Sequence, residues 1–167
     1  MRRIPPSELT LRPFHILDQR WALLVAGSAK PNPMTVSWGG FGTLWNKPVA
    51  TVYVRPTRHT FGLLDAEHAF TLNFLPERLR GVLDLCGSVS GRDADKWQAS
   101  GVKPVPSKAI EVPRVDGAEL ALECRVVASF DFDPKRFLDP TIVDLYPRHD
   151  FHRAFLGEVL AAWQSEG

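Results

Sequence analysis

Four polar residues able to bind an anion follow an apolar run near the middle of the chain; they are Arg55, Thr57, Arg58 and Thr60. The run itself, Val49–Val54, is apolar or β-favouring at nearly every position and predicts a strand covered on both faces. Pro56 restricts the residue before it to extended backbone and ends the strand. Thr57 is then a suitable N-cap for a short helix that runs through about Ala66.

The start of such a helix is suited to phosphate chemistry. Its first N–H groups have no partner within the helix, and the helix dipole places a partial positive charge there. Two guanidinium groups flank this point, and guanidinium binds phosphate oxygens well. The pattern therefore favours a phosphate ester, although a capped surface helix with two solvated arginines would show the same residues.

A second strand is predicted just before this one, over Met34–Trp38, where apolar residues alternate with Thr35 and Ser37. A loop, Ala29–Pro33, precedes it. A turn of three glycines follows, at Gly39, Gly40 and Gly42, and would let the backbone approach a flat ligand closely. The sequence GGFG lacks the third glycine and the βαβ context of a dinucleotide fingerprint, so we reject that interpretation.

A glycine- and serine-rich segment, Gly87–Arg92, is a second candidate anion site. It lies between a predicted helix over residues 76–86 and a short helix with Asp93 as N-cap and Gly101 as its stop. With Arg92 and Lys96 nearby, its backbone could form an anion-binding nest. It is not a Walker loop, because no Gly-Lys-Ser/Thr follows at the required spacing. A plain connection between two helices is the alternative.

The other apolar runs predict mostly strands. Trp21–Ala26 is expected to be buried, and Phe70–Phe74 alternates and is expected to be half-buried. Ala118–Ser129 is the clearest strand, with Glu123 on its polar face. Ala154–Trp163 fits a strand or a helix by pattern alone. Short strands without regular βα alternation favour a closed antiparallel barrel over a parallel sheet.

The connections and the domain limits follow from composition. Residues 102–117 contain three prolines and predict a long excursion, and residues 130–147 predict a loop with a strand near Thr141–Asp144. Residues 1–12 are expected to form a loosely held arm, and residues 13–167 a single domain of ordinary size.

Other chemistries find little support in the residues. The chain has no G-x-S-x-G elbow, and no serine or cysteine is visibly matched to a histidine and an acid. His149 and His152 lie three apart without a third soft ligand, so we predict no metal site. Asp93 and Asp95 are typical of a helix start rather than of a glycosidase pair.

Composition excludes further classes. The net charge is +1 over 167 residues without long charged runs, which indicates neither a nucleic-acid nor a membrane surface. The two cysteines, Cys86 and Cys124, are too few for a disulfide framework. The first residues, MRRIPPSELTLRPF, contain no apolar stretch typical of a signal peptide. We therefore expect a cytoplasmic protein.

Five separated motifs together resemble one family. They are NPMTVSWGGFGTLWNKP from Asn32, VRPTRHT from Val54, CGSVSGRDADKW from Cys86, ELALECR from Glu119 and YPRHDFHRAFLGEV from Tyr146. In this order they resemble the flavin reductase-like family of small FMN-binding proteins, over about residues 13–159. The resemblance implies a mainly β fold, an antiparallel split β-barrel of the FMN-binding type with short helices between strands. It also favours a strand for the first half of Ala154–Trp163.

The resemblance further implies where FMN would bind. The implied cofactor-binding residues are Asn32, Met34, Thr35, Ser37, Trp38, Val54, Arg55, Thr57, Arg58, Thr60, Cys86, Gly87, Ser88, Ser90, Arg92 and Lys96. The earlier strands would pass the ring, the Arg55–Thr60 segment would hold the phosphate and ribityl chain, and the Cys86–Lys96 segment would close over the cofactor. His152 would stand on the substrate face. Pro33 lacks an N–H where the family has a small or polar residue, and His59 replaces a frequent tyrosine.

The implied activity is that of an FMN-dependent oxidoreductase, which passes hydride from NAD(P)H to flavin and then to an acceptor. The partners would be a nicotinamide nucleotide, free flavin or a redox protein, and a second copy of the chain, because family barrels form homodimers with the flavin close to the interface. A flavoredoxin-like electron carrier, or a flavin-binding module without efficient NAD(P)H turnover, is the alternative. A cofactor-free interaction domain is a third interpretation.

Overall fold

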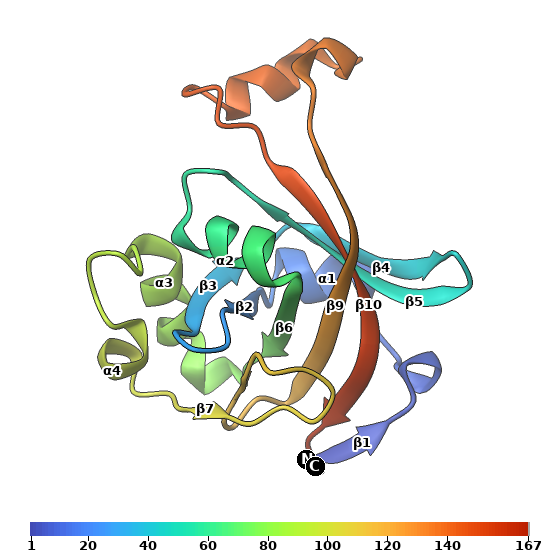
Figure 1. The fold of residues 1–167 in the computed structure, drawn as a ribbon, viewed down its shortest axis with the longest axis vertical. Helices are drawn as coiled ribbons and strands as arrows, with labels where there is room; N and C mark the ends of the chain where they lie inside the picture. The colour runs from blue at the N-terminus through green and yellow to red at the C-terminus, as the bar shows by residue number, and fades with distance from the viewer. Residues whose placement is uncertain (167) are drawn as a thin grey trace.

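The computed structural model describes residues 1–166, which form one large sheet, a two-stranded ribbon and short connecting helices (Figure 1). The strands are β1 (Arg2–Ile4), β2 (Ala22–Ala26), β3 (Asn32–Val36), β4 (Gly39–Leu44), β5 (Lys47–Val54), β6 (Ala69–Phe74), β7 (Pro104–Val105), β8 (Arg114–Val115), β9 (Leu120–Asp131) and β10 (Arg153–Gln164). The α-helices are α1 (Pro13–Asp18), α2 (His59–Glu67), α3 (Arg80–Ser88) and α4 (Lys96–Ser100), and the 3-10 helices are η1 (Pro6–Glu8), η2 (Glu77–Leu79), η3 (Pro134–Arg136) and η4 (Pro140–Leu145). The mainly β prediction is confirmed.

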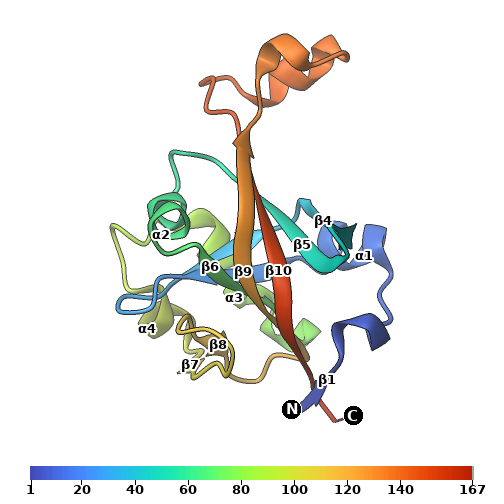
Figure 2. The ribbon, with the colours of Figure 1, turned by 45° about the vertical axis from the view of Figure 1, so that its right-hand side comes forward.

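All ladders of the large sheet are antiparallel, in the order β3-β2-β6-β9-β10-β5-β4, with β1 also beside β10. The twelve-residue strands β9 and β10 form the long hairpin at the centre of Figures 1 and 2. Ala154–Trp163 is thus strand throughout, beyond the first half predicted. Over residues 1–166 no ladder joins the end strands β3 and β4. The closed barrel predicted from pattern is therefore wrong, and the sheet is open.

The largest core cluster lies between this sheet and helices α1 and α2, with Phe70, Phe74 and Phe155 among its largest side chains. Gly157 on β10 allows the Phe70 ring to pack directly against the strand backbone, because a Cβ at this position would lie 2.5 Å from that ring. The β9–β10 register shifts between Leu156 and Gly157. A second cluster packs α3 against the other face of β2; its members include Leu23, Val25, Val82, Leu83 and Cys86.

Strand β6 is buried on both faces, so the prediction that Phe70–Phe74 is half-buried is wrong. Its polar side chains bind the excursion that covers them. Thr71 Oγ1 donates to the Pro113 carbonyl at 2.8 Å, and Asn73 Oδ1 accepts from Val115 N–H at 3.0 Å. Burial of these groups is tolerated because each has a hydrogen-bond partner.

Glu123 on β9 is also fully buried, although the alternation of its strand placed it on the polar face. Its carboxylate accepts from Lys108 N–H, Ala109 N–H and Trp163 Nε1–H, and its Oε1 lies 3.1 Å from Arg114 Nε. The excursion over residues 102–117 is thereby fixed to the sheet by a buried carboxylate.

The N-terminal residues are not a loosely held arm. Arg2–Ile4 pair with Ala162–Gln164 at the end of β10, and Ile4 is buried in the main core. Both ribbon views show β1 beside the end of β10 (Figures 1 and 2). A strand at the start of the chain thus covers one side of the last strand.

At the opposite end of the hairpin, residues 132–151 extend away from the body of the sheet (Figures 1 and 2); we call them the projecting segment. Residues 140–145 form the 3-10 helix η4, so the strand predicted near Thr141–Asp144 is wrong. Asp139 begins this helix by accepting from Thr141 N–H. The aromatic rings of the segment pack on one another; they are Phe132, Phe137, Tyr146 and Phe151.

The predicted glycine turn is also wrong. Gly39, Gly40 and Gly42 belong to β4, which pairs with β5. The turn between these strands comes later, at Trp45 and Asn46, whose φ angles are +52° and +57°. Pro33, placed in a loop by the sequence, lies within β3 opposite Val25. Over residues 1–166 no helix has the length and apolar character needed to cross a membrane.

Candidate functional site

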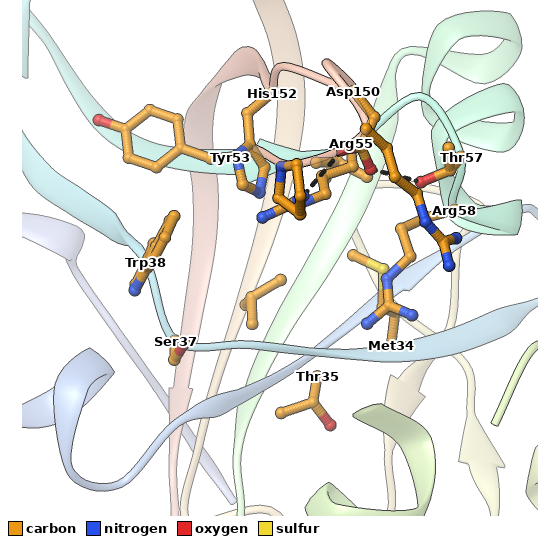
Figure 3. A pocket seen from close by; sticks show the side chains of 14 residues that line it. Met34, Thr35, Ser37, Trp38, Tyr53, Arg55, Thr57, Arg58, Asp150 and His152 are labelled. Carbon is orange, nitrogen blue, oxygen red and sulfur yellow. Dashed lines mark hydrogen bonds and ion pairs between the residues drawn. The ribbon is translucent and has the colours of Figure 1, made fainter. Parts of the chain in front are cut away.

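A cavity of about 420 Å³ lies where β3 and β5 end against the base of the projecting segment (Figure 3). Cavities of this size are typical of small-molecule sites. Its lining residues are Met34, Thr35, Val36, Ser37, Trp38, Tyr53, Val54, Arg55, Thr57, Arg58, Pro147, Arg148, Asp150 and His152. Nine of the residues predicted to bind cofactor or substrate are in this set, and they come from three separate segments of the chain.

The pairing of β10 with β5 builds this cavity. Arg153 lies opposite Val54, so the residues just before β10 meet the residues just after β5. Arg55 Nη1 forms an ion pair with Asp150 Oδ1 at 2.9 Å, and Arg55 Nη2 donates to the Leu145 carbonyl at 2.9 Å. Arg55, predicted as a phosphate ligand, thus joins the end of β5 to the projecting segment.

The predicted cap of helix α2 is wrong. The N-cap residue is Arg58, without a side-chain cap, and the helix begins at His59. Thr57 instead donates its hydroxyl to Asp150 Oδ2 at 3.1 Å. Burial would raise the pKa of Asp150, but the Thr57 hydrogen bond and the Arg55 guanidinium together lower it below its ordinary value. An ionised carboxylate therefore lies on this side of the helix start.

The positive side of the helix start faces a smaller adjoining cavity of about 200 Å³. The residues lining it are Asn32, Met34, Thr57, Arg58, His59, Thr60, Val89, Ser90, Gly91, Lys96 and Arg148. Met34, Thr57, Arg58 and Arg148 line both cavities, which therefore adjoin. Two of the predicted cations, Arg58 and Lys96, thus line this second cavity.

Side-chain bonds fix the walls of the smaller cavity. Asn32 Nδ2 donates to Thr60 Oγ1 at 2.8 Å, and Arg58 Nη2 donates to the Gly87 carbonyl at 2.9 Å. Arg92 Nη1 donates to the Thr57 carbonyl at 3.0 Å. The glycine- and serine-rich segment thus packs onto the start of α2.

Lys96 joins three elements rather than projecting into open space. Its buried Nζ donates to the carbonyls of Pro33 and Cys86 at 3.0 and 2.9 Å. Burial lowers the pKa of Lys96, and the Cys86 thiol beside it acts in the opposite direction. The N-cap of its helix is Asp95, which accepts from Trp97 N–H, so the predicted cap Asp93 is wrong. The predicted stop, Gly101, is confirmed by its φ of +74°.

Four of the predicted cofactor contacts line neither of these two cavities; they are Cys86, Gly87, Ser88 and Arg92. Cys86 is fully buried in the second core cluster, and burial raises the pKa of its thiol to about 11. Gly87 and Ser88 line a third hollow, of about 340 Å³, together with Thr35 and Ser37. Thr35 donates its hydroxyl to the Leu83 carbonyl at 2.5 Å. The Cys86–Ser88 segment thus stands behind β3 rather than over the main cavity.

His152 lies at the wall of the main cavity, beside Trp38, whose ring centre is 5.4 Å from the imidazole centre (Figure 3). Its Nδ1 is 2.8 Å from the Tyr146 hydroxyl. Burial lowers the pKa of His152 to about 4, and the nearby Arg55 acts in the same direction. The imidazole is therefore neutral at pH 7 and reaches the cavity.

The sequence reasoning missed several lining residues. Tyr53 carries no signal beyond its place in a strand pattern, Arg148 lies within the motif that begins at Tyr146, and Asp150 lies between the two histidines of the weak metal candidate. The charges within YPRHDFH were the available signal, but only the β5–β10 register places them beside Arg55. Among residues 1–166, no three side chains of the His, Cys, Asp and Glu types lie together as a metal site would require.

Comparison with known proteins places this geometry in one family. The model of the flavin reductase like domain matches residues 18–167. An uncharacterised protein of Deinococcus radiodurans is 31% identical over 81 residues, which are 48% of this chain and 36% of that protein. The chain thus matches about a third of the length of this relative.

Solved structures share the fold over nearly the whole chain. An FMN-binding protein from Thermus thermophilus with bound p-hydroxybenzaldehyde has a TM-score of 0.72 and 26% identity, covering 100% of this chain and 83% of that one. The flavoredoxin of Desulfovibrio vulgaris (Miyazaki F) has a TM-score of 0.71 and 20% identity, and the match covers 99% of this chain and 78% of that one. An NADH:FAD oxidoreductase of Streptomyces globisporus C-1027, in complex with NAD and FAD fragments, has a TM-score of 0.67 and 20% identity. This match covers 87% of this chain and 74% of that one.

An open antiparallel barrel with a cavity between a strand end and a helix start defines the class of split-barrel, flavin reductase-like proteins. The chain belongs to the flavin reductase-like family. The predicted fold and the predicted family are both confirmed.

The low pKa of His152 predicts a measurable dependence on pH. Because its pKa falls from 6.5 when unfolded to about 4 when folded, the unfolded chain binds more protons between these values. The free energy of unfolding should therefore fall as pH drops from about 6.5 to about 4, and His152→Gln should lose this part of the dependence. An NMR titration of the His152 ring protons checks the pKa directly, and a midpoint near 6.5 would contradict it.

Proposed function

We propose that this protein is an FMN-dependent NAD(P)H oxidoreductase. The observation that carries the proposal is a cavity of about 420 Å³ that adjoins a cationic helix start through shared residues, among them Arg58 and Arg148. A planar ring system with an anionic tail has this division of shape and charge. Family membership supports a flavin as the occupant.

The residues present fit FMN in one orientation. The helix start of α2 with Arg58, Thr60 and Ser90 would hold the phosphate, because free N–H groups and a guanidinium meet there. Asp150, already bound to Arg55 and Thr57, excludes the phosphate from the other side of the helix start. The ring would lie along Met34–Trp38, with Val54 beneath it and Tyr53 at its edge.

Bound FMN supplies hydride transfer, so the chain itself needs only to bind, orient and exclude water. Trp38, 45% exposed, and His152 would form the wall against which the nicotinamide lies. The Arg55–Asp150 ion pair would keep the projecting segment in place as the roof of this wall.

A flavoredoxin-like electron carrier is the second candidate. The similarity in fold to the Desulfovibrio flavoredoxin favours an electron carrier. The similarity in fold to the Streptomyces oxidoreductase, whose structure contains NAD fragments, favours an enzyme that uses NAD(P)H. The carbonyl compound bound to the Thermus protein indicates that an aromatic aldehyde can also serve as a probe of this cavity.

The two candidates separate in one experiment. The protein is purified, its visible absorbance is recorded with and without added FMN, and NADH or NADPH is then added anaerobically. The enzyme oxidises many equivalents of nicotinamide when free flavin is supplied, whereas the carrier is bleached once at most. A colourless protein that takes up no FMN would contradict both.

Arg58→Ala should weaken FMN binding about ten- to a hundredfold, since a charge-assisted hydrogen bond contributes about 1.5–3 kcal/mol. Arg2→Ala is the matched control, because Arg2 is an exposed arginine on β1, at the far end of the sheet. Quenching of flavin fluorescence measures both affinities. Equal affinity in the two variants would remove Arg58 from the site.

We further propose that two copies associate through the projecting segment and that the protein works in the cytoplasm. Leu138 and Leu145 expose 98% and 51% of their surface on this segment, which also contributes Pro147, Arg148 and Asp150 to the main cavity. Leu138→Asp should therefore shift the measured mass from that of a dimer toward that of one chain, 18.7 kDa, in light scattering. A wild-type protein that is already monomeric would contradict the dimer.

The proposed location is tested separately by cell fractionation. Recovery of the native protein outside the cytoplasmic fraction would contradict it.

A further inference from the structure

Tyr146 connects the projecting segment to the cavity through a single hydrogen bond. Its hydroxyl lies 2.8 Å from His152 Nδ1, and both residues are buried, with 3% and 8% of their surface exposed. His152 lines the main cavity, whereas Tyr146 is absent from its lining. The imidazole therefore has one nitrogen on the protein side and the other available to the cavity.

The surroundings of Tyr146 hold its phenol ring in place. The Arg55 guanidinium lies over the phenol ring, 4.8 Å from its centre, and is itself held by Asp150 and the Leu145 carbonyl. The ring of Phe151 packs against the same phenol at 4.9 Å. The position of the hydroxyl oxygen is thus fixed by contacts on several sides.

The direction of the hydrogen bond follows from counting protons. A neutral imidazole carries one N–H, and a phenol carries one O–H. Within residues 1–166 the Tyr146 hydroxyl has no acceptor other than His152 Nδ1, so a proton on Nδ1 would leave the buried phenol proton unbonded. Burial also raises the pKa of Tyr146 and lowers that of His152, so both groups are neutral at pH 7. The hydroxyl therefore donates, Nδ1 accepts, and Nε2 carries the ring proton.

We propose that Tyr146 is a positioning residue, which fixes His152 as the Nε2–H tautomer and so presents a neutral hydrogen-bond donor to the cavity. Such a donor matches an uncharged carbonyl oxygen on the ligand that lies over the flavin ring, and it does not match an ammonium or another N–H group. The position of this ligand over the flavin rests on the proposed function, whereas the assignment of the His152 tautomer does not. On the proposed enzyme, the carboxamide oxygen of NAD(P)H meets this requirement.

The tautomer can be measured on the purified full-length chain without flavin. Long-range ¹H–¹⁵N correlation on ¹⁵N-histidine protein should show Nε2 protonated and Nδ1 unprotonated for His152, a signal assigned by its loss in His152→Gln. Tyr146→Phe should give a mixture of tautomers, and Tyr53→Phe, which alters another tyrosine beside the cavity, should leave the signal unchanged. A protonated Nδ1 in the wild-type protein would overturn the proposal, even if Tyr146→Phe failed to fold.

Kinetics test whether Tyr146 acts through His152. Tyr146→Phe should raise the KM for NADH about two- to tenfold, as expected for one weakened hydrogen bond, while the affinity for FMN is unchanged. The glutamine of His152→Gln also presents a neutral N–H, but needs no tautomer, so adding Tyr146→Phe to it should have no further effect. An equal rise in both backgrounds would show that Tyr146 acts independently of His152. Absence of NADH turnover would contradict the proposed function and leave the NMR result standing.

Discussion

The antiparallel register of β10 on β5 is the constraint on which the site depends. With Arg153 opposite Val54, the residues that leave one strand and enter the other must meet at the same corner of the sheet. The ion pair between Arg55 and Asp150 and the hydrogen bond from Thr57 join these two ends of chain. Because a shift of one residue would turn every side chain of a strand to the other face, this register cannot change without loss of the cavity.

Two kinds of contact hold the site from behind. Lys96 donates to carbonyls of β3 and α3, and Arg58 donates to the carbonyl of Gly87, so the starts of α2 and α4 are joined to β3 and to the end of α3. On the far face, the buried carboxylate of Glu123 fixes the excursion that covers β6. Charged groups at these positions are stable because each has partners that replace water.

The division of charge around the cavity has a functional meaning. Arg55 forms an ion pair with Asp150, whereas Arg58 and Arg148 line both cavities, including the smaller one proposed to hold the phosphate. His152 adds a neutral polar group at the opposite wall, next to an exposed tryptophan. A flavin-binding protein needs this arrangement, since the tail of the cofactor is anionic and the face of its ring must stay open to a second ligand.

The sequence by itself determined several of the buried strands, the family and many of the residues near the site. Val49–Val54 and Ala22–Ala26 are strands because their composition suits a buried pleated surface, and the spaced motifs fixed the family. Tertiary structure alone decided which polar groups are buried, as at Asn73 and Glu123. The alternation of residues along a strand indicates which face a side chain lies on, but not whether another segment covers that face. Tertiary structure also decided the partner of Arg55 and Thr57, because Asp150 lies 95 and 93 residues from them in sequence and meets them only through the pairing of β5 with β10.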